Sequence, residues 1–291
     1  MKGKVCIVTG TSAGIGKATS IGLAKLDATV VAVMRDSQKS SAALEEIKTK
    51  SGKADSVIHL AADLSSQKSI RDLVKEFTSR FDRLDVLLNN AGVSQFHRSL
   101  SPDGIEMTFA VNVLAPFLLT TLLTDKLKSS APSRIVNVSS AASNNAEIDF
   151  DDLQGEKKYG SFRIYEQSKL CLNLITVEFS RRLEGTRVTA NFLHPGVIRT
   201  ELGTRDANLI FKAIAALVKL FMASPEKGSR TSIYLSTSPD VESVTGKYFA
   251  NQKQVAANPI SFDVATTKRL WEVCEKMTGV SISPQPAKVM S

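Results

Sequence analysis

Cysteine and histidine are scarce in this sequence, and neither is spaced as a metal site or a disulfide framework would require. The 291 residues include three of each, far apart and without a Cys-x-x-Cys pair. This spacing argues against paired disulfides and against structural zinc. The pattern of a secretory signal is also missing, and no uninterrupted apolar run reaches the roughly 18–20 residues of a membrane-spanning helix. We therefore expect a cytoplasmic, reducing environment and no transmembrane segment.

Dense runs of one charge are absent too, although the chain is basic. The formal net charge is +8, which by itself suits nucleic acid, a membrane surface or an anionic ligand. The basic residues are spread along the chain, and no nucleic-acid recognition motif occurs. We expect no specific nucleic-acid partner. A nonspecific nucleic-acid binder is the alternative that charge alone would favour.

Short β-branched runs alternate with stretches of helical periodicity along most of the chain. We expect strands at residues 4–9, 29–34, 56–61, 84–89, 134–138 and 188–193, and helices at 15–25, 40–50, 67–81, 105–127 and 164–183. This alternation predicts an α/β fold, a doubly wound, mostly parallel sheet of the Rossmann type with helices on both faces. No linker-like stretch divides the chain. We therefore expect residues 1–291 to form a single domain, with an appended segment at about 204–223.

A glycine-rich turn follows the first expected strand and precedes the first expected helix. It reads Gly10-Thr11-Ser12-Ala13-Gly14-Ile15-Gly16. Gly10 would allow a tight turn, Gly14 would let a pyrophosphate approach the backbone, and Gly16 would permit close helix–strand packing. The free N–H groups and the dipole of the helix would then favour a phosphate. Glycine-rich turns also occur for structural reasons alone, but this strand–turn–helix context favours dinucleotide binding.

The spacing of these glycines, together with four further motifs, resembles the short-chain dehydrogenase/reductase family. The motifs are Asn89-Asn90-Ala91-Gly92, Ser139-Ser140, Tyr165-Glu166-Gln167-Ser168-Lys169 and Pro195-Gly196. The resemblance covers about residues 3–250, and stretches at 151–159, 195–202 and 224–234 make it strongest toward the retinol-dehydrogenase-like branch. It implies hydride transfer between a nicotinamide cofactor and the carbonyl or alcohol carbon of a small molecule.

The end of the second strand indicates which nicotinamide is used. An acidic residue there bonds the ribose 2′-OH of NAD, whereas an arginine nearby accommodates the 2′-phosphate of NADP. Met34 stands where the acid would be and Arg35 follows, which favours NADP(H). Asp36 would oppose this preference, and a solvated turn in which Arg35 pairs with Asp36 is the alternative. Lys17 would add positive charge near the same phosphate.

The resemblance implies further cofactor contacts. Asp63 would lie near the adenine, although it also suits the N-cap of the next helix. Gly92 would leave room for the ribose, and Thr200 would reach the carboxamide. The complete set implied for the cofactor is Gly10, Ser12, Gly14, Ile15, Gly16, Arg35, Asp63, Leu64, Asn90, Ala91, Gly92, Tyr165, Lys169, Pro195, Gly196, Val197 and Thr200.

Tyr165 is the residue that we expect to handle the proton. It shares a helix face with Lys169, one turn further on. A free tyrosine has a pKa of about 10, and the ammonium, with an oxidised cofactor, would lower it into the range of a general acid/base. Only one of Ser139 and Ser140 can point into the site, and the resemblance favours Ser140 as the partner of the substrate oxygen. By resemblance Asn112 holds a water in a proton relay through Lys169; a helix-bending hydrogen bond is its alternative or additional role.

The substrate side is indicated by an apolar stripe at residues 207–223, just after the Pro195-Gly196 motif. The stripe suits a mobile cover over the substrate, contact with a membrane surface, or packing on the domain edge. Residues 95–98 and 142–150 would form other walls. We expect a lipophilic aldehyde, ketone or alcohol, retinoid-like compounds included, and a homo-oligomer paired through residues 105–127 and 164–183. The alternative is a regulator that binds NADP without turnover, although such proteins usually lack the tyrosine or lysine that this chain keeps.

Overall fold

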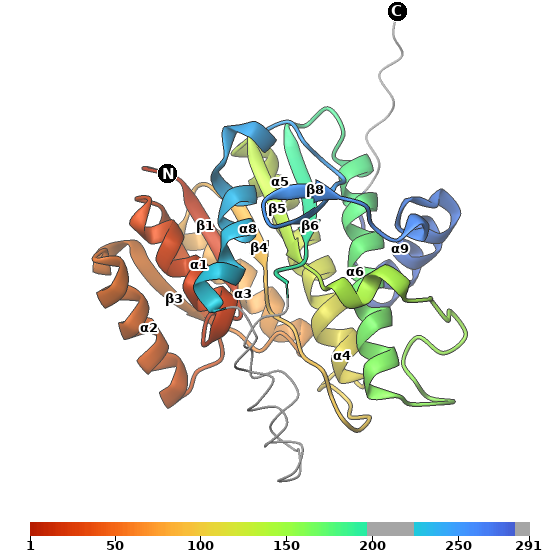
Figure 1. The fold of residues 1–291 in the computed structure, drawn as a ribbon. Helices are drawn as coiled ribbons and strands as arrows, with labels where there is room; N and C mark the ends of the chain where they lie inside the picture. The colour runs from red at the N-terminus through yellow and green to blue at the C-terminus, as the bar shows by residue number, and fades with distance from the viewer. Residues whose placement is uncertain (197–223, 283–291) are drawn as a thin grey trace, which may run out of the picture.

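The computed structural model describes residues 1–196 and 224–282, and its centre is one eight-stranded sheet (Figure 1). The strands stand in the order β3-β2-β1-β4-β5-β6-β7-β8. Neighbouring pairs from β3 to β7 are parallel, whereas β8 runs antiparallel to β7. The doubly wound, mostly parallel sheet predicted from the sequence is confirmed. The strands are β1 (Val5–Thr9), β2 (Thr29–Met34), β3 (Val57–Ala61), β4 (Val86–Asn89), β5 (Ser133–Val138), β6 (Val188–Leu193), β7 (Tyr248–Ala250) and β8 (Lys253–Val255).

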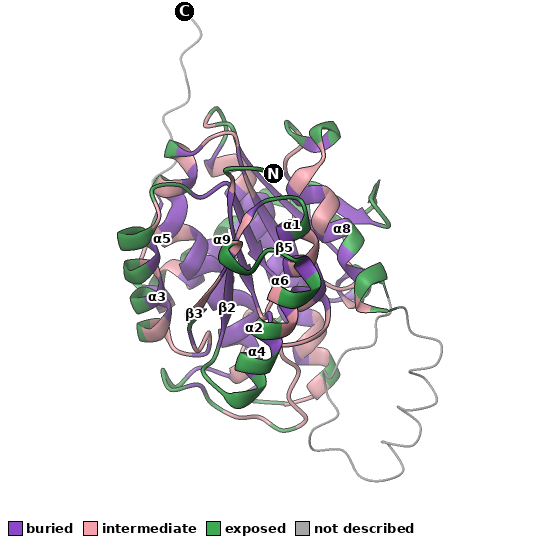
Figure 2. Ribbon diagram, turned by 90° about the vertical axis from the view of Figure 1, so that its left-hand side faces the viewer, coloured by how far each residue is buried: buried purple, intermediate pink, exposed green. Residues whose placement is uncertain are grey.

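Helices cover both faces of the sheet. One face carries α1 (Gly14–Lys25), α2 (Gln38–Ser51) and α8 (Pro225–Thr237); the other carries α3 (Gln67–Arg80), α4 (Met107–Phe109), α5 (Ala115–Ser129), α6 (Ser161–Arg182) and α9 (Val264–Thr278). Shorter helical turns are η1 (Ala54–Ser56), η2 (Ala110–Leu114), η3 (Ala141–Asn145), η4 (Pro239–Val241) and η5 (Pro259–Phe262). Successive strand residues point to opposite faces, so Ile7 enters one core and Val8 the other. Figure 2 shows the central strands buried between these two helical layers.

The long helix expected at residues 105–127 is interrupted by a wide turn. α4 leads into η2, a single π-helical turn, and α5 begins after it. Pro116 in the first turn of α5 has no N–H, and in a regular helix its ring would collide with the carbonyl of Asn112, four residues earlier. The wider turn accommodates the proline and leaves the Asn112 side chain fully buried. Turns of this kind are frequent at functional sites.

The helical run Met107–Ser129 is, among the described residues, long and apolar enough to cross a membrane by length and composition. We expected no stretch of this kind, because we counted only uninterrupted apolar runs. The helical run Met107–Ser129 corrects that expectation. Within the fold, 83% of the most apolar window is buried. Packing on the sheet and against α3 and α6 accounts for this apolarity, so the run is weak evidence for a membrane contact.

The C-terminal helix α9 packs on α5 and α6, an arrangement not expected from the sequence. Trp271 is fully buried against Phe117 and Phe179, with ring centres 4.8 and 4.7 Å away. The Arg182 guanidinium lies 4.2 Å from the centre of the Trp271 ring. Residues 167–179 of α6 are all buried. α9 thus covers part of the two helices that were expected to pair with a second copy, while the oligomeric state itself stays a prediction.

Replacing Phe179 by Ala should lower the free energy of unfolding by about 3–5 kcal/mol, because it removes a fully buried ring. Phe262→Ala is the matched control: its ring is 41% exposed, and we expect a loss below about 1 kcal/mol. Urea denaturation followed by circular dichroism measures both values. Equal losses in the two variants would contradict the packing described for α9.

Candidate active site

Four loops meet at the carboxyl edge of the sheet, the edge at which open α/β sheets bind their ligands. They follow β1, β4, β5 and β6, which are adjacent in the sheet. The loops carry residues 10–16, 89–92, 139–140 and 194–196. β1 and β4 also mark the place where the strand order reverses. The order of the strands therefore brings together motifs that are far apart in the sequence.

The glycine turn after β1 is shaped by the chain that follows β4. A Cβ on Gly10 would lie 2.8 Å from the Cα of Ala91, and a Cβ on Gly16 would lie 2.4 Å from the carbonyl oxygen of Gly10. Gly14 has a φ of 59° and nothing within 4 Å of the place for its Cβ, so the turn is open there. The first turn of α1 has no side-chain cap, which leaves its N–H groups available to a phosphate.

Hydrogen bonds fasten the ends of β1 and β4 to each other. Thr9 Oγ1 accepts from the N–H groups of Asn90 and Ala91, each at 3.0 Å. Asn90 Nδ2 donates back to the Thr9 carbonyl at 2.8 Å. Ser12, in the turn between β1 and α1, is half-exposed, and Ile15, in the first turn of α1, is buried. The glycine-rich turn predicted to bind the cofactor is therefore held in place by hydrogen bonds to the chain that follows β4.

At the end of β2, Arg35 and Asp36 are both exposed. The Asp36 carboxylate lies 3.8 Å from the His59 ring, and no ion pair joins it to Arg35. The alternative in which Arg35 is occupied by Asp36 is therefore not observed. Lys17, expected near the same phosphate, forms an ion pair with Glu46 of α2 at 2.5 Å. Among the described residues, Arg35 faces solvent and forms no ion pair with a carboxylate.

Asp63 organises the turn after β3 but does not cap α3. Its Oδ1 accepts from the N–H and the hydroxyl of Ser65, at 3.0 and 2.8 Å. The N-cap is Ser66, whose hydroxyl oxygen accepts from the Ser69 N–H. The N-cap alternative for Asp63 is therefore wrong. Leu64 lines a small hollow at the ends of β1 and β4, on the side expected for the cofactor.

Ser140 contacts Tyr165, whereas Ser139 points elsewhere. The Ser139 hydroxyl donates to the backbone carbonyl of Lys169 at 3.2 Å. Ser140 lies beside Tyr165 and by itself would lower the pKa of the phenol, but burial outweighs this effect and raises the pKa above its usual value. Our expectation of a lowered pKa is thus not met by the protein alone, since desolvation dominates and Lys169 Nζ stays 5.9 Å from the centre of the ring.

Lys169 is a buried ammonium group. The residue is 4% exposed, and its Nζ donates to the Val138 carbonyl at the end of β5, at 3.0 Å. Burial lowers its pKa from 10.5 to about 8. Gly92 permits this position, because a Cβ there would lie 3.2 Å from Nζ. The space that we expected Gly92 to leave for a ribose therefore also accommodates the lysine.

Asn112 joins three parts of the site. Its Oδ1 accepts from the Val93 N–H at 2.8 Å, and its Nδ2 donates to the Val93 carbonyl at 2.9 Å and to Ser168 Oγ at 3.0 Å. The loop after β4, the π-turn and α6 are thereby held together. Ser168 was missed as a member of the site, although its place beside Lys169 in the tyrosine–lysine motif was a signal. The water relay expected at Asn112 stays a prediction.

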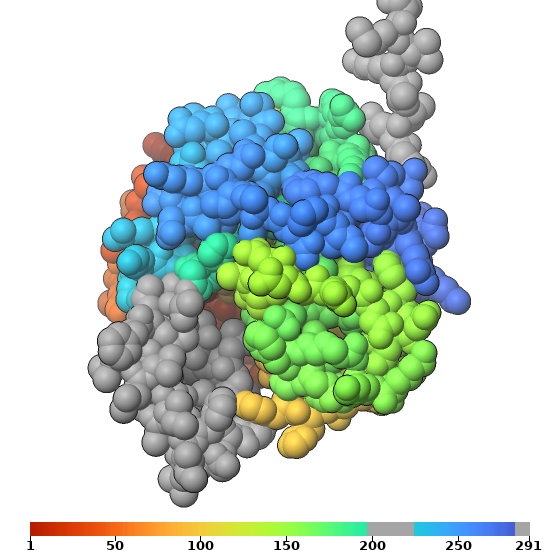
Figure 3. Space-filling view, turned by 45° about the vertical axis from the view of Figure 1, so that its right-hand side comes forward, coloured from red at the N-terminus to blue at the C-terminus, as the bar shows by residue number. Residues whose placement is uncertain are grey.

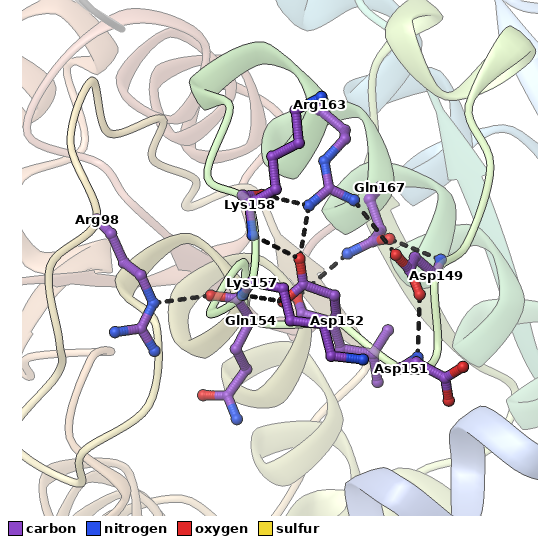
Figure 4. A network of polar contacts seen from close by, with 10 residues as sticks. Arg98, Asp149, Asp151, Asp152, Gln154, Lys157, Lys158, Arg163 and Gln167 are labelled. Atoms are coloured by element: carbon purple, nitrogen blue, oxygen red, sulfur yellow. Dashed lines mark hydrogen bonds and ion pairs between the residues drawn. The ribbon is translucent and has the colours of Figure 1, made fainter.

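The segment 146–160, between the serine and tyrosine motifs, is tied down on both sides (Figure 4). Asp152 is buried; its carboxylate accepts from two backbone N–H groups and pairs with Arg163 of α6 at 2.9 Å. Arg98 donates to the Gln154 carbonyl at 3.0 Å. Figure 3 shows the segment in green at the surface, below the blue C-terminal part. A cavity of about 500 Å³ lies between residues 145–149 and the start of α6.

After β6, the first of the two described ranges ends at Gly196. Pro195 and Gly196 stand at the carboxyl edge as expected, and the Gly196 N–H donates to His194 Nδ1 at 3.2 Å. Gly196 has a φ of 83°, a conformation that favours glycine. Val197, Thr200 and the segment 204–223 lie outside the described residues, so their expected roles stay predictions.

Lys169→Met should stabilise the fold at neutral pH, because it removes a buried ammonium. Lowering a lysine pKa from 10.5 to about 8 corresponds to a destabilisation of roughly 3 kcal/mol below pH 8. Allowing for the lost hydrogen bond to Val138, we expect a net gain of about 1–3 kcal/mol at pH 7. The unfolded chain keeps the lysine proton up to higher pH than the folded chain, so the stability of the unsubstituted protein rises between pH 8 and 10.5 and the advantage of the variant shrinks.

Urea unfolding at pH 7, 9 and 10.5 measures this difference. Lys68→Met is the matched control, since the Lys68 side chain is 84% exposed and should change stability by less than about 0.5 kcal/mol. A difference between Lys169→Met and the unsubstituted protein that stays constant with pH would show that Lys169 is not buried as an ion.

Known proteins with similar sequences and structures agree with this geometry. A family model described as short chain dehydrogenase matches residues 4–208. Homo sapiens retinol dehydrogenase 14 is 41% identical over 295 residues, covering 96% of this chain and 88% of that protein. Homo sapiens retinol dehydrogenase 13 is 42% identical over 293 residues, covering 98% and 88%.

Solved structures agree as well. An uncharacterised protein of Mycobacterium paratuberculosis superposes with a TM-score of 0.76 at 27% identity, covering 97% of this chain and 96% of its own. Pseudomonas aeruginosa RhlG in complex with NADP superposes with a TM-score of 0.68 at 25% identity, covering 86% and 94%. This chain therefore belongs to the short-chain dehydrogenase family of nicotinamide-binding oxidoreductases and is related to the retinol dehydrogenases.

Proposed function

We propose that this protein is an NADP(H)-dependent oxidoreductase that interconverts the alcohol and carbonyl forms of a lipophilic compound, retinoid-like aldehydes, ketones and alcohols included. The observation that carries the proposal is the meeting of Tyr165, Ser140 and Lys169 beside an open glycine turn. A phenol, a hydroxyl and an ammonium are what this reaction requires of a protein that has bound a hydride carrier. A regulator without turnover would have no need of the Tyr165–Lys169 pair.

The residues at the carboxyl edge fit a nicotinamide dinucleotide. The turn 10–16 is open at Gly14 and offers the uncapped N–H groups of α1, which suits a pyrophosphate. Asn90 and Ala91 line the way from this turn toward Lys169. Lys169 Nζ donates to the Val138 carbonyl and has further protons for the ribose hydroxyls. Chain elements for both halves of the cofactor are therefore present along one edge.

Arg35 supports NADP(H) over NAD(H). It is exposed at the end of β2, and the preceding residue, Met34, offers no carboxylate for a ribose hydroxyl. A guanidinium matches the geometry of a phosphate. Asp36, the nearest acid, lies beside His59 instead of Arg35. The NADP complex of RhlG belongs to a protein similar to this one, which agrees with this assignment.

Tyr165 transfers the proton in the proposed reaction. The nicotinamide, when bound, supplies or accepts the hydride. Because burial holds the pKa of Tyr165 above its usual value, the phenol is protonated at neutral pH, the form that gives a proton to a carbonyl oxygen. Ser140 donates a second hydrogen bond to that oxygen and stabilises its developing charge. The nearby ammonium of Lys169 favours the phenolate that is left behind.

A lipophilic substrate is supported by the relatives, since two similar proteins are named retinol dehydrogenases. All three cysteines are buried free thiols, which suits the reducing cytoplasm that we expected. Peripheral membrane contact stays a prediction.

Tyr165→Phe should reduce the turnover of an aldehyde with NADPH by about 10²–10⁴-fold, since it removes the proton donor and keeps the ring. NADPH binding, followed by the fluorescence of the reduced nicotinamide, should stay within about threefold of the unsubstituted protein. Tyr234→Phe, in helix α8 on the face of the sheet opposite α6, is the matched control and should retain full turnover. Unchanged turnover in Tyr165→Phe would rule out the proposed mechanism.

Arg35→Ala should weaken NADPH binding by about 10–100-fold, because a hydrogen-bonded charge pair contributes about 1.5–3 kcal/mol. NADH binding should stay unchanged, since NADH has no 2′-phosphate. Arg80→Ala removes an exposed arginine at the end of α3 and serves as the control for net charge. Equal weakening of NADPH and NADH by Arg35→Ala would contradict the assignment of this residue to the 2′-phosphate.

A further inference from the structure

The turn that carries Ser140 is held by side chains from three other elements. The Ser140 carbonyl accepts from the Ser143 hydroxyl at 2.7 Å and from the Tyr248 hydroxyl at 3.2 Å. Ser143 Oγ in turn accepts from Nδ2 of Asn173, in α6, at 2.9 Å. Asn258 donates to two carbonyls of the same turn, at 3.3 and 2.9 Å. The position of Ser140 is therefore set by contacts with α6, β7 and the chain before η5.

Tyr248 is the largest of these side chains and is fully buried. It is 1% exposed, its ring stacks on Phe192 of β6 at 4.9 Å, and the His194 ring lies 5.5 Å away. Burial raises the pKa of Tyr248 to about 12, so its hydroxyl keeps its proton and remains a donor across the neutral range. Tyr248 thus connects the turn after β5 to the end of β6. It lies beyond residues 4–208, which match the family model.

We propose that Tyr248 is a positioning residue of the active site, whose buried hydroxyl fixes the Ser140 peptide group and so holds the Ser140 hydroxyl against Tyr165. The Ser140 hydroxyl also accepts from the Ala142 N–H at 3.2 Å, so its direction follows the geometry of the turn. A turn that loses the bond from Tyr248 keeps the Ser143 contacts but gains freedom at the serine. The Ser140 hydroxyl is then held less firmly beside Tyr165. The role in catalysis rests on the proposed function, whereas the role in geometry does not.

The geometric part is tested by NMR at pH 7, without substrate. Protein labelled with ¹³C at the ζ carbon of its four tyrosines gives a Tyr165 signal that is identified by its loss in Tyr165→Phe. Ser140→Ala should shift this signal, and Tyr248→Phe, which keeps the stacked ring, should shift it in the same direction by a smaller amount. Tyr234→Phe is the matched control and should leave it in place. A Tyr165 signal that responds to Ser140→Ala but not to Tyr248→Phe would overturn the proposal.

The catalytic part is tested by a double-mutant cycle. Tyr248→Phe should lower kcat by roughly 3–30-fold, the range of coupling within one hydrogen-bond network, with the KM and the dissociation constant for NADPH unchanged. In a Ser140→Ala background the same substitution should have no further effect. A merely structural role would instead lower the rate by the same factor in both backgrounds, which would refute the proposal.

A second variant covers the case in which Tyr248→Phe fails to fold. Asn258→Ala acts on the same turn from a half-exposed position, and it should shift the Tyr165 signal in the same direction as Ser140→Ala. Lack of turnover by the unsubstituted protein on a panel of aldehydes and ketones would count against the proposed function. The NMR result would still decide whether Tyr248 positions Ser140.

Discussion

The structure of the site depends on one lysine ammonium that is almost entirely buried. Lys169 Nζ is held by the Val138 carbonyl, and Gly92 provides the space beside it. Burial lowers the pKa of this group to about 8, so the charge persists at neutral pH at a cost in stability. Such strained placements are retained where function needs them. The rest of the fold must supply the stability that this position takes away.

That stability comes largely from α6, which carries the lysine, and from α9, which packs on α6. α6 is buried along residues 167–179, and Trp271 of α9 packs against Phe179. On the inner side, Pro116 forces the π-turn that presents Asn112 to Val93 and Ser168. α6 therefore packs in the core on one side and carries residues of the active site on the other. A change that loosens α9 is expected to reach the site through α6.

Much of the fold could be predicted, because parallel strands covered on both faces read as continuous apolar runs. The motifs after β1, β4 and β5 could be placed at one edge, because the carboxyl ends of parallel strands meet there. The π-turn could not be read from apolar periodicity, although Pro116 was a local signal for it. β7 and β8 have three residues each, too few to show a period, so Tyr248 escaped notice. The raised pKa of Tyr165 in the protein without cofactor could not be predicted, because a sequence shows neighbouring charges but not the extent of burial.

The ionisation of Lys169 tests the central claim most directly. NMR of lysine side chains in ¹⁵N-labelled protein, with the Lys169 signal identified by its absence in Lys169→Met, measures this pKa in the intact fold. The account predicts a pKa of about 8, well below the 10.5 of an ordinary lysine. A Lys169 pKa that stays near 10.5 would show an accessible ammonium and would contradict the buried arrangement on which the site is built.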